Sequence, residues 1–266
     1  MPIFFDKLTL PMELISQATL ILIAIFALSS VFHGLTGIGV TLIATTALAS
    51  FYPMSQVILL TVIPCLVINL VVFLDGGQVG YYLKKYWLLA LTSFVGSFLG
   101  AKLLFIIAQH YLLVALGMLI IGYVLMTFVG NYLGKSFKLP NNKPSLIISG
   151  TVAGVLGGAT NAMSPLLVMY LLSATKGQAN AKAELIKSSN LCYVVGKVAQ
   201  FIALYPLFVA TPVGDWGVLG VVTMISLGCL YVGFYFRDKL PQAVFRQLVL
   251  VILLALGIKS LVNGLL

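Results

Sequence analysis

Long apolar segments separated by short polar connections make up nearly the whole chain. The segments fall at about 14–33, 38–51, 54–74, 86–107, 111–130, 145–158, 162–174, 183–205, 215–236 and 243–263. About 20 apolar residues cross the hydrocarbon core of a membrane, so most of these segments predict transmembrane helices. Three of them, 38–51, 145–158 and 162–174, are shorter and suit half-helices better than complete crossings.

Composition excludes a soluble domain. The 266 residues are 61% hydrophobic and 8% charged, against about 25% charged in soluble proteins, and the mean hydropathy is +1.13. The net charge of +9 comes from basic residues scattered over short loops. This distribution favours the positive-inside bias of a membrane protein over nucleic-acid binding. We therefore expect one integral membrane domain, with lipid as its surroundings and no cleaved signal peptide.

A glycine-rich stretch, 33–41, interrupts the uncharged run from Leu14 to Tyr52. A helix breaks most readily there, and inside a membrane a break is tolerated only where protein or a wet cavity surrounds it. A similar stretch, 154–161, occurs in the second half. Two matched broken helices indicate the binding site of a transporter.

The two halves of the chain resemble each other. Gly34 and Gly37 match Gly154 and Gly157 at one offset (154 − 34 = 157 − 37 = 120). Later matches, in the same order, pair 55–74 with 183–202, Gly96 to Gly100 with Gly228 to Gly233, and 116–119 with 256–258. Four ordered matches predict an internal duplication, with repeats at 1–135 and 136–266.

Loop charges predict the topology. Ten of the 15 basic residues lie in the loops 75–86, 131–144, 175–182 and 237–246, which we place in the cytoplasm. Residues 14–51 and 145–174 then each form a re-entrant hairpin, followed by three crossings. Because three is odd, the second repeat is inverted, and both termini lie outside. The expected fold is an all-α polytopic membrane protein with two inverted-topology repeats, each a broken helical hairpin followed by three transmembrane helices.

The hairpin tips and one intramembrane cation are the candidate binding site. Unpaired N–H groups at two facing helix N-termini attract an anion, and Lys197 lies well inside 183–205 with no membrane carboxylate to pair with. Asn69 is its partner in the repeat alignment. The candidate substrate-binding residues are Gly34, Thr36, Gly37, Gly39, Thr41, Asn69, Gly157, Gly158, Thr160, Asn161, Ser164, Ser189, Asn190 and Lys197.

Each candidate also has a purely structural interpretation. The glycines could serve only close helix packing, Lys197 could extend to the membrane surface, and Asn69 could bond a neighbouring helix. Chemical roles for His33, Cys65 and Cys192 stay open. No ATP-binding, protease or metal-ligand motif occurs, so we expect a non-enzyme without cofactor or metal.

The chain resembles the sulfite exporter TauE/SafE family of bacterial membrane transporters. The resemblance rests on Gly34-Leu-Thr-Gly37-Ile-Gly39, Pro53-Met-Ser-Gln56, Gly96-Ser-Phe-Leu-Gly-Ala-Lys102 and the last helix from Phe245 to Lys259. It implies export of a small sulfur-containing anion, such as sulfite or an organosulfonate, across the bacterial inner membrane.

The residues alone leave alternatives: an anion channel, a carrier of a carboxylate or thiosulfate, or a non-transporting protein that binds a lipid headgroup. The identity of a coupling ion (proton or sodium), the direction of transport and formation of a homo-oligomer also stay open.

Overall fold

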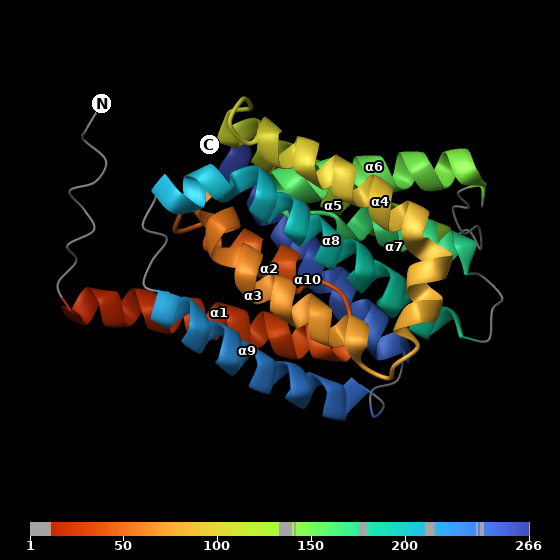
Figure 1. Cartoon of the computed structure of the whole chain (residues 1–266), viewed down its shortest axis with the longest axis horizontal. Helices are drawn as coiled ribbons and strands as arrows, with labels where there is room; N and C mark the ends of the chain where they lie inside the picture. Colours follow the sequence, from red (N-terminus) through yellow and green to blue (C-terminus); the bar gives the residue numbers. More distant parts are fainter. Residues whose placement is uncertain are drawn as a thin grey trace.

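The computed structural model describes residues 12–132, 140, 142–175, 180–210, 216–237, 239 and 242–265, and in these ranges the regular structure is entirely α-helical (Figure 1). The helices of the first half are α1 (Met12–Thr36), α2 (Val40–Leu48), α3 (Met54–Leu74), α4 (Val79–Leu103) and α5 (Gln109–Tyr132). Those of the second half are α6 (Lys143–Thr160), α7 (Ser164–Ala174), α8 (Ala181–Ala210), α9 (Trp216–Arg237) and α10 (Gln242–Leu265).

Local sequence explains several helix boundaries. Pro53 precedes α3 because it lacks an N–H and disfavours helix at the residue before it. Asn142 caps α6, where its side chain accepts a hydrogen bond from the Ser145 N–H at 2.9 Å. Gly76 and Gly77 form the turn that follows α3, and both have positive φ angles, which glycine adopts readily.

Two expected boundaries were wrong. The loop expected at 75–86 is shorter, because α4 already begins at Val79 and carries Lys84 and Lys85. The connection expected from Pro206 begins later, since α8 continues through this proline to Ala210. Neighbouring helices and side chains can compensate for the missing N–H of such a proline in a membrane. The predicted half-helix at 145–158 corresponds to α6, which is 18 residues long and is not among the candidate membrane spans of the described residues.

Six described helices are long and apolar enough to cross a membrane. Their candidate spans are Thr19–Thr36, Met54–Leu74, Val79–Leu103, His110–Gly130, Ala181–Ala210 and Trp216–Arg237. By contrast, α2 and α7 have only 9 and 11 residues, too few to cross the hydrocarbon core. The chain is therefore an all-helical integral membrane protein with two short helices, each of which follows a longer helix after a break.

Helices of the two halves pack against each other in pairs. The most extensive pairs are α4 with α6, α1 with α9, α5 with α10, and α3 and α4 with α8. Glycines allow two of these approaches: Gly154 lies on Gly96 between α6 and α4, and Gly34 lies on Gly233 between α1 and α9. In both places a Cβ atom would overlap backbone of the facing helix. Gly228, by contrast, has no atom within 4 Å of the position of a Cβ.

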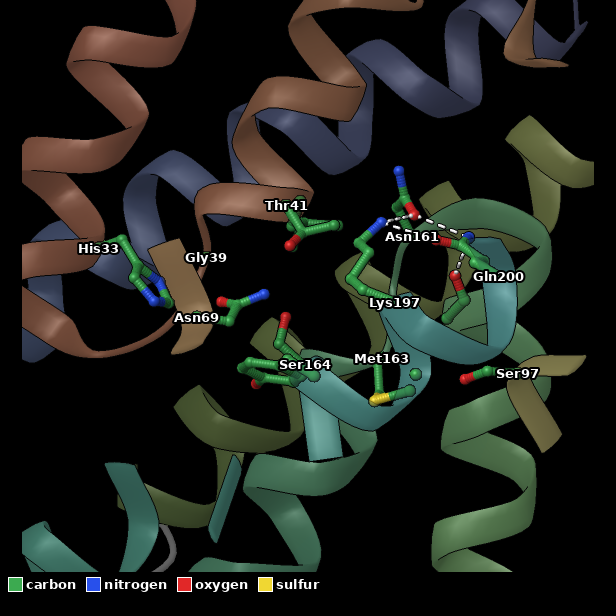
Figure 2. A pocket seen from close by; sticks show the side chains of 14 residues that line it. His33, Gly39, Thr41, Asn69, Ser97, Asn161, Met163, Ser164, Lys197 and Gln200 are labelled. Carbon is green, nitrogen blue, oxygen red and sulfur yellow. Dashed lines mark hydrogen bonds between the residues drawn. The ribbon is translucent and has the colours of Figure 1, made fainter. Parts of the chain in front are cut away.

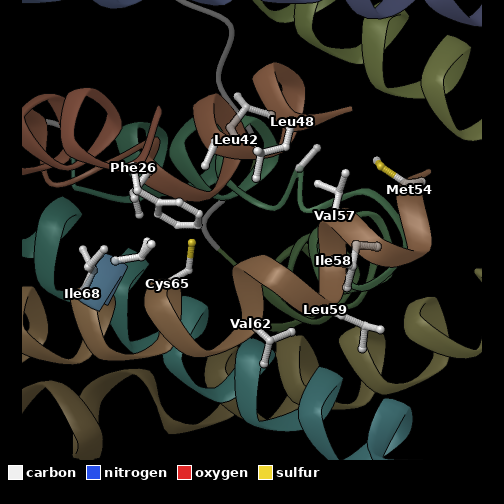
Figure 3. Close-up of a cluster of buried hydrophobic side chains, with 14 of the residues drawn as sticks. Phe26, Leu42, Leu48, Met54, Val57, Ile58, Leu59, Val62, Cys65 and Ile68 are labelled. Carbon is white, nitrogen blue, oxygen red and sulfur yellow. The ribbon is translucent and has the colours of Figure 1, made fainter. Parts of the chain in front are cut away.

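Apolar side chains from both halves fill the interior. Figure 3 shows Phe26, Leu42 and Cys65 close together within this cluster, and all three are 1% exposed or less. Leu204 and Leu219 of the second half belong to the same cluster. The two halves thus share this hydrophobic cluster.

Charged side chains gather at the end of the bundle that carries the α3–α4 loop. The Lys187 Nζ donates to the carbonyls of Phe73 (2.7 Å) and Asp75, so a cation caps the end of α3. Arg237 pairs with the Asp75 carboxylate at 3.2 Å and donates from Nε to the Gly34 carbonyl at 2.8 Å. These bonds join α1, α3, α8 and α9.

Some topology predictions fall on residues that the structure does not describe. Much of 131–144 and 175–182, part of 237–246, and the chain before Met12 lie outside the described residues. The cytoplasmic placement of the four basic loops and the outside placement of both termini therefore stay predictions.

Gly96→Ala tests the close approach of α4 and α6. The new methyl group would lie 3.0 Å from the Gly154 Cα and overlap the Thr151 carbonyl, so we expect a loss of about 1–3 kcal/mol of stability, measured as a lower Tm in detergent. Gly228→Ala is the control, because a Cβ there meets nothing within 4 Å. Equal melting temperatures for the two variants would contradict the packing.

Candidate functional site

The first helix break, at Gly37 to Gly39, is held by two polar side chains. Gly37 and Gly39 have φ angles of 70° and 109°, which only glycine adopts readily. Asn190 of α8 donates to the Gly37 carbonyl at 2.7 Å, and its Oδ1 lies 3.1 Å from the His33 Nε2. The Val40 N–H at the start of α2 donates to the His33 Nδ1 at 3.4 Å. The end of α1 and the start of α2 are thus both partnered inside the protein.

These bonds define the role of His33. Its Nδ1 accepts from a backbone N–H, so Nε2 carries the hydrogen and donates to the Asn190 Oδ1. Both ring nitrogens are occupied, and a proton could pass through His33 only if one of these bonds broke. The geometry matches a hydrogen-bonded interior histidine rather than a proton relay.

Asn161 organises the second break, between α6 and α7. The residue ends α6 with a left-handed φ of 61°, a conformation that Asn tolerates better than most residues. Its Nδ2 donates to the hydroxyls of Thr45 (2.7 Å) and Thr61 (2.9 Å). Its Oδ1 accepts from the Lys197 Nζ at 2.6 Å and from the Gln200 Nε2 at 3.0 Å. One side chain of the second break therefore connects α2, α3 and α8.

Gln200 completes the cluster. Its Nε2 donates to the carbonyls of Gly157 (3.1 Å) and Gly158 (2.8 Å), near the end of α6. Its Oε1 accepts from Lys197 at 2.8 Å. We did not predict this residue, although it follows Lys197 by three positions and so lies on the same helix face.

The two breaks contact α8 at different levels. The first meets Asn190 and the second meets Gln200, ten residues further on (200 − 190 = 10), which is about 15 Å along a helix axis. The helices before the two breaks, α1 and α6, end at Thr36 and Thr160, which are 124 residues apart (160 − 36 = 124). This separation exceeds the glycine offset of 120 by about one helical turn. Gly157, the sequence partner of Gly37, accordingly lies inside α6 rather than in the break.

A narrow cavity, with polar side chains among its lining residues, lies between the two breaks (Figure 2). The described residues that line it are His33, Gly39, Thr41, Leu42, Asn69, Ser97, Gly157, Asn161, Met163, Ser164, Tyr193, Gly196, Lys197 and Gln200. Its water-sized space is about 20 Å³, and about 10–15 Å³ of such space holds one water molecule. In this state the cavity has room for one or two water molecules, so a larger ligand binds only when side chains around it move outward.

The charge of the lining has one sign. Lys197 is 5% exposed, and its two described partners are the neutral amide oxygens of Asn161 and Gln200. No Asp or Glu is among the described lining residues. An ammonium group has three donors, and these bonds use two of them. The cavity therefore favours an anion.

The start of α2 adds backbone donors. Ile43 is the first α2 residue whose N–H donates to the carbonyl four residues earlier, that of Gly39, at 2.8 Å. The preceding N–H groups of Thr41 and Leu42 have no partner within the helix, and both residues line the cavity. The start of α7 contributes less: Ser164 lines the cavity, but Pro165 has no N–H.

Asn69 is one of two described lining residues with buried polar atoms that lack a partner, the other being Tyr193 with its hydroxyl. It lines the cavity from α3 and is 0% exposed. Neither its Nδ2 nor its Oδ1 has a hydrogen-bond partner among the described residues. A buried amide without partners costs about 1–3 kcal/mol per group. Such a group in a native protein requires an explanation, and ligand binding is one.

The structure brings together half of the predicted site residues. Those that line the cavity are Gly39, Thr41, Asn69, Gly157, Asn161, Ser164 and Lys197. The others have structural contacts. Gly34 packs on Gly233, Gly37 on Ile186 and Gly158 on Ser97. The hydroxyls of Thr36 and Thr160 bond the carbonyls of Ile38 and Leu156. Asn190 holds the first break, and Ser189 is buried beside it.

Sequence reasoning did not select the rest of the lining. Tyr193, Gly196 and Gln200 lie on the face of α8 that presents Lys197, and a helical projection of α8 centred on Lys197 would have found them. Ser97 and Met163 gave no such signal. Cys65 and Cys192 are both buried, and neither is among the lining residues.

A polar cavity between two broken helices, inside a bundle of membrane-spanning helices, is the architecture of a membrane transporter. The family model described as "Sulfite exporter TauE/SafE" matches residues 21–260. The chain thus belongs to the TauE/SafE family, whose members are membrane transport proteins. Comparisons with curated proteins and with solved structures found no match.

Gln200→Leu tests the cluster at the second break. The change removes the donor to two buried carbonyls and an acceptor of Lys197, so we expect a loss of about 1–3 kcal/mol, read as a lower Tm. Val198 lies on the same helix and is 37% exposed, so Val198→Leu should leave the Tm unchanged. If both variants melt like the unmodified protein, Gln200 does not hold the break.

Proposed function

We propose that the protein is a secondary transporter that exports a small sulfur-containing anion, bound between the two helix breaks and Lys197. The observation that carries this proposal is a buried cavity with one cation and no carboxylate among its described lining residues. Family membership supplies the substrate class. Loop charge supports placement in the bacterial inner membrane with the basic loops in the cytoplasm.

The packing of the helices supports an inverted repeat. If α1 to α5 correspond in order to α6 to α10, then the pair α1–α9 corresponds to α6–α4, and α3–α8 and α5–α10 each correspond to themselves. These pairs are among the most extensive, whereas the extensive pair α4–α8 has a smaller counterpart in α9–α3. A twofold pseudo-axis through the cavity accounts for this pattern, and alternating access then follows from movement of one set of helices against the other.

Three kinds of donor would hold the anion: the Lys197 ammonium group, the N–H groups of Thr41 and Leu42, which have no partner within α2, and the Asn69 amide. Together they resemble the backbone-plus-cation sites that bind oxyanions elsewhere. The small cavity favours an inorganic oxyanion of sulfite size over a longer organosulfonate.

Lys197→Met tests the cation. Loss of a buried charge contact costs about 2–5 kcal/mol, and a factor of ten in affinity is about 1.4 kcal/mol. We therefore expect sulfite uptake by proteoliposomes to fall at least about tenfold. Lys102→Met, a matched change at an exposed position in α4, should transport normally. Full transport by folded Lys197→Met would remove Lys197 from the site.

Asn161→Asp tests the preference for an anion by adding a negative charge to the cavity. The substitution keeps the shape but places a carboxylate 2.6 Å from the Lys197 Nζ, giving the lysine an internal counter-ion. We expect sulfite binding, measured by calorimetry, to fall at least about tenfold with the fold retained. Asn142→Asp, the same change at the exposed cap of α6, should bind as the unmodified protein does. Tighter sulfite binding by Asn161→Asp would contradict an anion site.

A further inference from the structure

We infer that Asn69 is a specificity-determining residue, and that it makes the site selective for a monoanion carrying its own hydrogen-bond donor, as hydrogensulfite does. This inference rests on the proposed function and concerns the protonation state of the substrate, which membership of a sulfite exporter family does not specify.

The unsatisfied atoms of Asn69 set the first requirement. Its Nδ2 offers donors and its Oδ1 offers an acceptor, and both are buried without described partners. Rotation of the amide by 180° exchanges the two atoms but leaves one donor group and one acceptor to satisfy. A ligand that pairs with the whole amide needs both an oxygen to accept and a hydrogen to donate.

Charge sets the second requirement. Lys197 contributes one positive charge, and the described lining holds no other Lys or Arg. A monoanion balances this charge, whereas a dianion such as sulfite or thiosulfate would leave one negative charge buried without a partner, which is costly.

The two requirements select the same ligands. Sulfite and thiosulfate dianions have only acceptors, so they would leave the Asn69 Oδ1 unsatisfied, at about 1–3 kcal/mol. Methanesulfonate has the right charge but no polar hydrogen. Hydrogensulfite has one negative charge, oxygen acceptors and one hydrogen.

The direction of the side chain fits this assignment. Figure 2 shows the Asn69 amide pointing into the space between Gly39, Thr41 and Ser164, with Lys197 across the cavity. An oxyanion held against Lys197 and the start of α2 would therefore turn another of its atoms toward Asn69. Because the cavity is narrow in this state, binding includes a small outward movement of the side chains around Asn69.

Binding measurements on the purified full-length protein test the inference. Sulfite passes from hydrogensulfite to the dianion near neutral pH, while methanesulfonate stays a monoanion. We expect the affinity for total sulfite to fall about tenfold per pH unit above that transition, and the affinity for methanesulfonate to stay constant. Methanesulfonate also reports any titration of His33, Tyr193 and Lys197, the titratable groups that line the cavity, and of Cys65, one turn before Asn69 in α3.

Asn69→Leu separates the role of the amide from that of the charge. Leucine has nearly the same shape and neither donates nor accepts. At a pH below the transition, the preference of the unmodified protein for hydrogensulfite over methanesulfonate should be about tenfold, equivalent to one or two hydrogen bonds. In Asn69→Leu this ratio should fall to about one.

The outcomes are distinct. Tighter binding at higher pH would show that the dianion is the ligand and overturn the inference. A water molecule on Asn69 in place of the ligand predicts equal affinities for the two monoanions in the unmodified protein, which would also overturn it. Persistence of the hydrogensulfite preference in Asn69→Leu would assign selectivity elsewhere. If the unmodified protein bound no sulfur anion, the proposed function would fail together with the inference.

Discussion

The constraint on which this structure depends is that a helix ending inside the protein must find partners for its last carbonyls and for the first N–H groups of the next helix. Each buried backbone group without a partner costs several kcal/mol. The protein meets the constraint with amide and imidazole side chains. Asn190 and His33 hold the first break, and Gln200 holds the end of α6 at the second. Asn190 and Gln200 both come from α8, so this helix fixes the two breaks relative to each other.

The same solution determines the chemistry of the cavity. The side chains that hold the second break are neutral amides, and Lys197 bonds to two of their oxygens. Neutral partners stabilise the ammonium group by hydrogen bonding while leaving its charge uncompensated. A carboxylate in place of Gln200 could not donate to the Gly157 and Gly158 carbonyls, and it would cancel the charge of Lys197. The choice of Asn161 and Gln200 therefore keeps the cavity attractive to anions.

The sequence predicted the features that local physics determines. Apolar length and Pro53 located α3, whose bounds of Met54 and Leu74 coincide with the expected segment. The cost of burying a charge singled out Lys197, and the repeat alignment singled out Asn69. Features that depend on tertiary contacts were missed. The second break lies one turn beyond the position that glycine spacing indicates, because Asn161 ends α6 and Gln200 binds its final carbonyls. Gln200 itself resembles an ordinary polar residue in the sequence, since its partners are backbone atoms of a distant helix.

The glycine contacts between α1 and α9, and between α6 and α4, have a consequence for how the molecule assembles. Each broken helix rests on a helix contributed by the opposite half, so the two halves are interlaced rather than adjacent. Neither half could bury its own broken helix alone, and α1 would lack its packing partner in the bilayer until α9 had been inserted. The interlacing therefore prevents the two halves from separating into independent units, and the single chain ensures that both are present in equal number.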